Sequence, residues 1–308
     1  MKKINWILLL AITLLFAACG NSENNSAGKE TVPVVHQKGT SNVPKEIKRI
    51  VCLDYSILET LDALNIEVVG IPKGNLPAHL SKYKDNANVV DVGTLLEPNL
   101  EKINELKPDV ILISGRTEKV YDELNKIAPT VFMAPDAKDF MNSMKKEWDI
   151  IGKLFGKEAA VNTAFESLQS KVAALNEKAK EKNKKALVLM FNKGKFSAYG
   201  KDSRFGVIFN VMGLIPAVED IEKATHGQAV SNEFIQKANP DIIFVIDRSA
   251  VVDKKASNTE DVENALVKQT AAYKNGKVIY LNPDYWYLAG SGIHSANRMV
   301  EDISKALD

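Results

Sequence analysis

Hydrophobic residues along this chain fall into short runs that alternate with amphipathic, helix-like stretches. In the first half the runs are 50–53, 68–71, 89–92, 110–113 and 130–133, and each has the length of a strand. The alternation resumes with runs at 186–191, 242–246 and 278–281, a helix near 205–212 and a last helix over 293–307. Strands that alternate with helices predict an α/β fold in which helices cover both faces of parallel sheets.

The stretch 157–183 separates the two halves and contains neither Gly nor Pro. Its apolar residues keep helical spacing, which predicts a single helix about 40 Å long. We expect this helix to join two Rossmann-like lobes stiffly, 45–156 and 184–308, with a ligand cleft between the lobes. An ordinary surface helix of the second lobe would show the same spacing. The apolar positions are Ala160, Val161, Ala164, Phe165, Leu168, Val172 and Leu175.

A segment of the first half recurs 132 positions later in the second half. Residues 98–116 read PNLEKINELKPDVILISGR, and residues 230–248 read VSNEFIQKANPDIIFVIDR. In this register Glu101 corresponds to Glu233, and Arg116 corresponds to Arg248. Each copy is predicted to form a helix, a Pro-Asp turn and a strand that is covered on both faces. The recurrence indicates two lobes of similar construction.

The Arg that ends each copy follows the predicted strand at its carboxyl end. Ligands of open α/β sheets bind in the crevice beyond these strand ends. Arg116 and Arg248 are therefore predicted to face one cleft from opposite sides. The alternative is that each Arg pairs with a nearby acidic side chain.

The first residues have the composition of a secretion signal. Lys2 and Lys3 precede an apolar run over 6–16, which is too short to span a membrane. The run ends in Ala-Ala-Cys-Gly, which resembles a bacterial lipobox, where Cys19 becomes the lipidated first residue of the mature chain. Phe16 stands where a Leu is usual. A plain secretory signal and an uncleaved anchor are the alternatives to a lipoprotein signal over 1–18.

Residues 19–44 are rich in Asn, Ser, Gly, Lys and Thr, and this composition predicts a flexible tether. A strand near 31–35 is the alternative, and Pro33 would confine it to a sheet edge. The other thiol of the chain, Cys52, lies in an apolar run and is predicted to be a small buried core residue. Removing Lys2 and Lys3 takes the net charge from +1 to about −1, so nucleic acid is not favoured as a partner.

The lipoprotein signal, the repeated segment, the long helix and the sequence NPDYWYLAGSG near the C-terminus together resemble the ferric-siderophore-binding lipoproteins of bacterial ABC importers. The resemblance covers 45–308 and is to the helical-backbone class, within it to the catecholate and petrobactin type. It implies a monomeric receptor, lipid-anchored in the cell envelope, that delivers a ferric siderophore unchanged to a permease dimer. It implies neither an enzymatic activity nor a permanent cofactor, because the ferric siderophore is cargo.

The resemblance implies that Arg116, Arg204 and Arg248 contact the chelate. A ferric catecholate is an anion, and guanidinium groups supply fixed positive charge together with directed hydrogen-bond donors. Arg204 lies just before a predicted helix and, taken alone, is equally compatible with a local pair with Asp202. Trp286 is expected to pack or stack at the cleft wall.

The resemblance also implies two protein ligands to iron, His226 and Tyr287, for siderophores that supply only four donor atoms. Phenolate oxygen is a hard donor that suits ferric iron, and imidazole is an acceptable borderline donor. A solvent-exposed loop histidine and an aromatic residue packed at a strand end are the ordinary alternatives. Tyr285 competes with Tyr287 for the assignment.

Glu101 and Glu233 are the docking residues that the resemblance implies, one acid in each lobe pairing with arginines of the two permease subunits. The alternative is a solvated acid on a helix face, as for most glutamates. Glu97, beside Pro98, is a second candidate in the first lobe.

Other functions would use the same residues differently. A haem- or cobalamin-binding receptor of the same architecture could use His226 and Tyr287 as axial ligands, although three arginines favour a more anionic cargo. A secreted hydrolase could use Ser291 and His294, but the Gly-x-Ser-x-Gly motif that exposes a nucleophile is missing. A lipoprotein of adhesion or signalling would not need paired docking acids. The sequence has no Cys or His cluster spaced for zinc.

Overall fold

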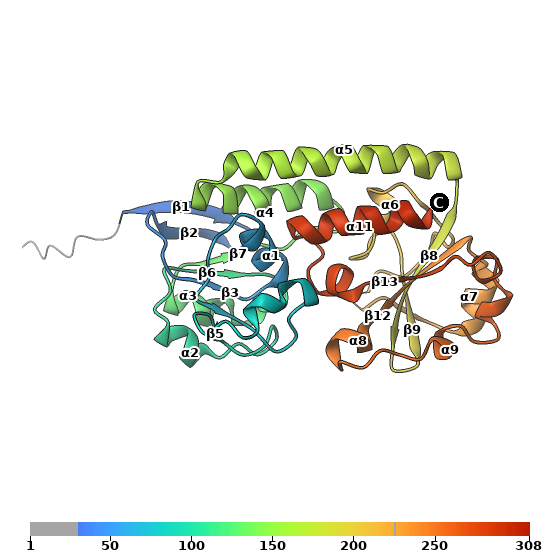
Figure 1. Cartoon of the computed structure of the whole chain (residues 1–308), viewed down its shortest axis with the longest axis horizontal. Helices are drawn as coiled ribbons and strands as arrows, with labels where there is room; N and C mark the ends of the chain where they lie inside the picture. The colour runs from blue at the N-terminus through green and yellow to red at the C-terminus, as the bar shows by residue number, and fades with distance from the viewer. Residues whose placement is uncertain (1–29, 225) are drawn as a thin grey trace, which may run out of the picture.

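The computed structural model describes residues 30–224 and 226–308, and it has two α/β lobes joined along one side by a long helix (Figure 1). The N-terminal lobe holds a parallel sheet in the order β5-β4-β3-β6-β7. Its strands are β3 (Ile50–Cys52), β4 (Gly70–Ile71), β5 (Val90–Asp91), β6 (Val110–Ile113) and β7 (Thr130–Phe132). Its helices are α1 (Tyr55–Ala63), η1 (Ala78–Tyr83), α2 (Leu100–Glu105), η2 (Glu118–Val120), α3 (Tyr121–Ile127) and α4 (Phe140–Phe155).

The C-terminal lobe holds a sheet in the order β11-β9-β8-β12-β13, with β10 paired to β8. Because β9 runs antiparallel to both of its neighbours, this sheet is mixed and not all parallel. Its strands are β8 (Lys185–Asn192), β9 (Lys195–Tyr199), β10 (Ile215–Pro216), β11 (Gln228–Val230), β12 (Ile242–Asp247) and β13 (Val278–Leu281). Its helices are α6 (Val207–Asn210), α7 (Asn232–Ala238), α8 (Arg248–Val252), α9 (Thr259–Val262), η3 (Val267–Gln269), α10 (Ala271–Lys274), η4 (Asp284–Leu288) and α11 (Ile293–Ala306).

The helix expected over 157–183 is α5 (Glu158–Lys182). It ends at Asn183, whose left-handed backbone (φ 49°) closes the last turn. Along its length α5 packs against α4 of the first lobe and α11 of the second. Helix α11 also packs against α1, so the C-terminal helix reaches the first lobe and gives a second connection.

The repeated sequence segments have the same local structure. A residue with left-handed backbone follows each of the helices α2 and α7, Lys107 (φ 44°) and Asn239 (φ 40°), at corresponding positions. In each copy the next Asp accepts a hydrogen bond from a backbone amide of the neighbouring strand. The donor lies just before β3 in the first lobe and at the first residue of β8 in the second. Asp109 accepts from the Arg49 amide, and Asp241 accepts from the Lys185 amide. The repeat therefore fixes how each helix leads into its strand.

Residues 31–44 form a β-hairpin, so the prediction of a flexible tether over 19–44 is wrong for this part. Strand β1 (Thr31–His36) pairs antiparallel with β2 (Gly39–Pro44). Val34 and Val43 are buried, and the Ser41 hydroxyl donates to the Thr130 carbonyl at 2.7 Å. The composition of this segment is polar because the hairpin buries few side chains. Its stability comes from contacts with β7, which the local sequence does not indicate. The predicted signal peptide and Cys19 lie outside the described residues.

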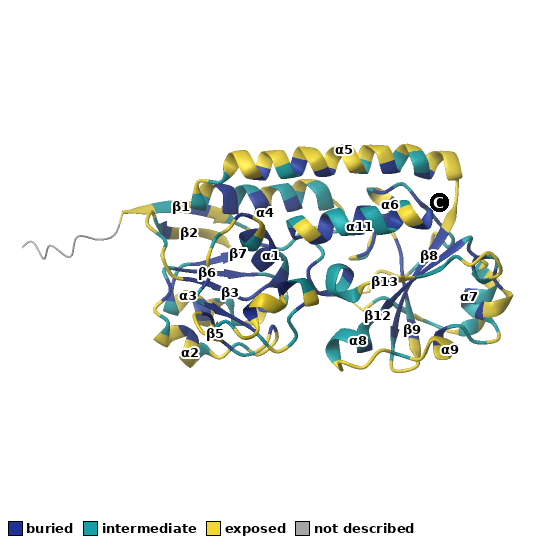
Figure 2. Cartoon of the chain, in the orientation of Figure 1, coloured by how far each residue is buried: buried dark blue, intermediate teal, exposed yellow. Residues whose placement is uncertain are grey.

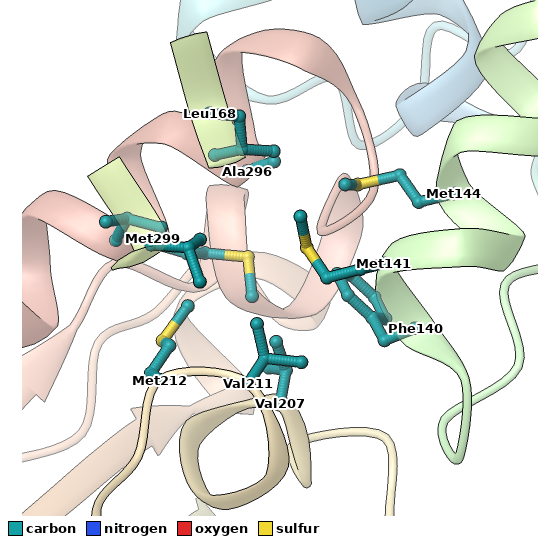
Figure 3. Close-up of a pocket in the computed structure, with 11 residues that line it drawn as sticks. Phe140, Met141, Met144, Leu168, Val207, Val211, Met212, Ala296 and Met299 are labelled. Atoms are coloured by element: carbon teal, nitrogen blue, oxygen red, sulfur yellow. The ribbon is translucent and has the colours of Figure 1, made fainter. Parts of the chain in front are cut away.

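An apolar core continues from one lobe into the other, with buried residues along the facing sides of α5 and α11 (Figure 2). Where α4, α5, α6 and α11 meet, the side chains leave a cavity of about 10 Å³, which is at most the space of one water (Figure 3). Four methionines line it, Met141, Met144, Met212 and Met299, and we call this contact the methionine seam. Cys52 is buried. Within 30–224 and 226–308, no helix has both the length and the apolar character needed to cross a membrane.

Candidate ligand-binding site

Three arginines from different elements surround the side chain of Tyr287. Arg116 lies in the turn after β6, Arg204 in the turn before α6, and Arg248 at the first position of α8. Their guanidinium carbons are 5.4, 4.8 and 5.8 Å from the centre of the Tyr287 ring. At these distances each cation is attracted to the ring face. We call these four residues the arginine site.

Hydrogen bonds fix the backbone and the hydroxyl of Tyr287 at the same time. The Tyr287 carbonyl accepts from Nη2 of Arg116 at 2.5 Å and from Nη2 of Arg204 at 2.8 Å. Nη1 of Arg116 donates to the Leu288 carbonyl at 3.2 Å. Nε of Arg248 donates to the Tyr287 hydroxyl at 3.0 Å. These carbonyls belong to η4, a single π-helical turn, a type of turn that is frequent at functional sites.

The arginine site carries more positive than negative charge. Asp54, which caps α1 with its carboxylate, lies 3.9 Å from Nη1 of Arg116. Arg248 has a neutral neighbour, because its Nη1 donates to the Asn192 side chain at 3.3 Å. Desolvation of its guanidinium, reinforced by the charge of Arg116, lowers the pKa of Arg204 to about 10, although the residue as a whole is exposed. Arg204 therefore stays a cation at neutral pH, and a site lined by three guanidinium groups suits an anion.

His226 lies in the turn that leads into β11, and it is exposed. Gly227 follows with a left-handed backbone (φ 74°), and a Cβ there would lie 2.7 Å from the Tyr199 ring. Among the described residues, the cationic side chains that contact Tyr287 are the three arginines, and His226 makes no such contact. The described part of the chain also holds no cluster of three His, Cys, Asp or Glu side chains placed to bind a metal ion.

The three consecutive aromatics of η4 point to different surroundings. Tyr285 packs against the rings of His79 and His294, with ring centres 4.9 and 5.5 Å away, and its contact with His294 is edge-to-face. Trp286 is 1% exposed and donates its indole N–H to Asp302 of α11 at 3.0 Å. The prediction that Trp286 lines the ligand site is therefore wrong, because the π turn directs it into the core. Of the two competing tyrosines, Tyr287 is the one beside the arginines.

The predicted docking acids lie on the surface at the starts of corresponding helices. Glu101 is in the first turn of α2 and Glu233 is in the first turn of α7, and both are exposed. Hydrogen bonding from Ser231 lowers the pKa of the Glu233 carboxyl. Glu97, the second candidate, is exposed in the turn before α2. All three acids are accessible to a protein partner.

The residues of the hydrolase alternative do not form a nucleophile and base pair. Ser291 is buried, and its carbonyl accepts from the Trp148 indole at 2.9 Å. His294 is exposed at the start of α11 and makes an edge-to-face contact with Tyr285. Sequence reasoning did not identify Asp54 and Asn192 as neighbours of the arginines. Each of them stands at or just after the carboxyl end of a buried strand, which was the available signal.

The arrangement has close parallels among known proteins. The sequence profile of the periplasmic binding protein family matches residues 50–285. The petrobactin-binding protein YclQ of Bacillus subtilis is 42% identical to this chain, and the alignment covers 100% of both proteins. The ferric-anguibactin-binding protein FatB of Vibrio anguillarum is 38% identical, over 89% of this chain and 87% of FatB.

Solved structures agree with this chain across both lobes. The crystal structure of YclQ from Bacillus subtilis matches with a TM-score of 0.88 and 43% identity, over 91% of this chain and 99% of the other. The periplasmic catecholate-siderophore binding protein VctP from Vibrio cholerae matches with a TM-score of 0.85 and 34% identity, over 90% of this chain and 100% of VctP. The two lobes and the helix between them are thus a shared architecture.

Proposed function

The chain belongs to the periplasmic binding protein family, and from this premise we propose that it captures ferric catecholate-type siderophores and delivers them to an ABC-transporter permease for iron uptake. The observation that carries the proposal is the convergence of Arg116, Arg204 and Arg248 on one aromatic side chain. A ferric catecholate combines negative charge with aromatic rings. Guanidinium groups can donate hydrogen bonds to catecholate oxygens and stack on the rings.

The names of the relatives support this class of cargo. YclQ is named for petrobactin, FatB for ferric anguibactin, and VctP for catecholate siderophores. All three cargoes are siderophores, which bind ferric iron through hard donor atoms. A family member with a strongly cationic site is therefore best matched by a cargo of this kind.

We place His226 and Tyr287 as iron ligands when the siderophore supplies only four donor atoms. The Tyr287 hydroxyl faces Arg248, whose Nε–H remains able to donate to the oxygen after the phenol loses its proton. His226 lies on an exposed turn next to a glycine with left-handed backbone, so it can reach a ligand without disturbing the core. Replacing His226 with Ala should weaken binding of a tetradentate ferric chelate and leave a hexadentate chelate unaffected. Equal losses for both chelates would refute the role of His226.

Delivery requires docking and an anchor, which we assign to Glu101, Glu233 and Cys19 of a monomeric lipoprotein. The double change Glu101→Ala and Glu233→Ala should abolish uptake of the ferric siderophore by cells without changing its affinity for the purified protein. Glu105→Ala, an exposed acid on the same helix as Glu101, is the matched control. Unchanged uptake in the double variant would reject these two acids as docking residues.

The first test is a titration of the purified chain, followed by tryptophan emission. Ferric enterobactin, a tetradentate ferric bis-catecholate, ferrichrome, haem and cobalamin are compared in parallel. Tight binding of the catecholates alone supports the proposal. Binding of haem, cobalamin or the hydroxamate instead would retain the fold and overturn the assignment of the arginine site.

A further inference from the structure

Residues 284–295 belong to the C-terminal half of the sequence but are fastened to the N-terminal lobe. Five hydrogen bonds join this segment to that lobe, and four of them are donated by the lobe. The Ala78 amide donates to the Asp284 carboxylate at 2.9 Å, and the Trp148 indole donates to the Ser291 carbonyl at 2.9 Å. The Ser295 hydroxyl donates to Glu59 at 3.1 Å. The remaining two come from Arg116.

Arg116 is the part of this fastening that acts on Tyr287 itself. Its two Nη atoms donate to the carbonyls of Tyr287 and Leu288, so one guanidinium holds two successive peptide units. Asp54 lies behind the guanidinium at 3.9 Å and is held by the amides of Ser56 and Ile57. A continuous set of polar contacts therefore runs from the start of α1 to the backbone of Tyr287.

We propose that Arg116 is a positioning residue, which ties Tyr287 to the N-terminal lobe as well as to the C-terminal lobe that carries His226. The inference rests on the proposed function, because it concerns the two iron ligands assigned there. His226 leads directly into β11, which pairs with β9 in the C-terminal sheet. Tyr287 is held from both lobes, because Arg204 and Arg248 of the C-terminal lobe also donate to it. Arg116 is therefore the contact that ties this iron ligand to the N-terminal lobe.

This arrangement separates two kinds of cargo. A hexadentate chelate fills the iron shell by itself and needs only the positive charge of the arginines. A tetradentate chelate needs one oxygen from Tyr287 and one nitrogen from His226. In that step the Tyr287 O–H bond breaks, its proton passes to solvent, and the phenolate oxygen binds iron without any change of oxidation state. Misplacing Tyr287 therefore penalises the tetradentate chelate selectively.

The fastening can be tested without any ligand by amide hydrogen exchange over 284–292. Arg116→Ala should speed exchange in this segment about tenfold, since two hydrogen bonds to the guanidinium are lost. Arg116→Lys should rescue it only in part, because a lysine cannot hold both carbonyls in the same fork. Arg49→Ala is the matched control, since Nε of Arg49 donates to the Leu106 carbonyl within the first lobe. Unchanged exchange in the Arg116→Ala chain would overturn the proposal.

The positioning role is then tested by a double-mutant cycle of Arg116→Ala with Tyr287→Phe, using both chelates. If Arg116 acts through Tyr287, its loss costs the tetradentate chelate less when Tyr287 is already replaced, with a coupling of about fivefold or more. For the hexadentate chelate the two changes should be additive. Additivity for both chelates would overturn the proposal. Failure of the unmodified chain to bind any ferric chelate would refute the proposed function instead, and hydrogen exchange would still decide the fastening.

Discussion

Two of the contacts between the lobes have opposite chemistry, the methionine seam and the arginine site. The seam is lined by apolar side chains of α4, α5, α6 and α11, and four of them are methionines. The arginine site joins the lobes through guanidinium groups and main-chain carbonyls. Methionine is flexible and fits irregular gaps, so the seam depends on apolar area more than on exact shape. The arginine site depends on direction, because each hydrogen bond tolerates little displacement.

The comparison teaches that stability and recognition are supplied by different contacts between the same two lobes. Changes in the methionine seam should therefore lower the free energy of unfolding and leave the ligand affinity of the folded protein unchanged. Changes at the arginine site should lower the ligand affinity and leave the free energy of unfolding unchanged.

The largest effect is expected for Met144→Ala in the seam. Met144 is fully buried, and truncating a buried methionine costs about 2 to 5 kcal/mol of unfolding free energy. Urea denaturation measures the loss, and titration at low temperature measures affinity for the ferric catecholate in the folded protein. Lys146→Ala, on the same helix, should change neither quantity. A large fall in the affinity of folded Met144→Ala protein would contradict the separation.

Glu147, on the same helix, should give stability an unusual pH dependence. Burial, reinforced by the charge of Asp54, raises the pKa of the Glu147 carboxyl from 4.5 to about 9. The folded protein therefore holds a proton that the unfolded chain releases, and its stability is lost as pH rises from about 4.5 toward 9. Relative to Glu147→Gln, the unmodified chain should lose about 2 to 3 kcal/mol between pH 6 and pH 8.

Urea denaturation of both chains at several pH values tests this expectation. Parallel pH profiles would mean that Glu147 is ionised in the folded protein. A fall in the free energy of unfolding that is confined to the unmodified chain would show that the buried Glu147 carboxyl is neutral in the folded protein.

At the arginine site, Arg248→Ala should lower affinity for a hexadentate ferric catecholate by roughly 10- to 100-fold, the value of about 1.5 to 3 kcal/mol for hydrogen bonds to a charged group. Raising the salt concentration should weaken binding by the unmodified chain more than by the variant. The variant has one positive charge fewer in the site, so salt screens less attraction between the variant and the anionic chelate. The melting temperature should change little. Arg298→Ala removes a half-exposed arginine that pairs with Glu301 and serves as the control. A variant that melts much earlier would place Arg248 among the stabilising contacts.

The smallest effect is expected for Trp286→Phe. This change keeps a buried ring and removes the hydrogen bond from the indole to Asp302, at a cost of about 1 kcal/mol in unfolding free energy. Affinity for the ferric chelate should be unchanged because Trp286 faces the core. A loss of affinity without a loss of stability would return Trp286 to the ligand site.

Much of the fold was predictable because its signals are local. The short apolar runs predicted the parallel strands β3, β6 and β12, and the unbroken helical spacing predicted α5. The hairpin β1–β2 was foreseen only in part, as the alternative of a strand near 31–35, because its few buried side chains gain their stability from contacts with β7, far along the chain. Strand β9 was missed for a related reason. Its turn uses left-handed backbone at Lys193 and Gly194, within a polar stretch that reads as a loop.

The sequence by itself indicated the two lobes, the repeat and the placement of Arg116 and Arg248, because hydrophobic period and position after a strand are properties of a short segment. Arg204 was implied only by the family resemblance. Only the tertiary structure decided which aromatic of 285–287 faces the arginines. In the π turn Tyr285 stacks on His79, Trp286 enters the core, and Tyr287 meets Arg116, Arg204 and Arg248. The direction of a side chain in an irregular turn is set by partners that lie far away in sequence, so no local pattern encodes it.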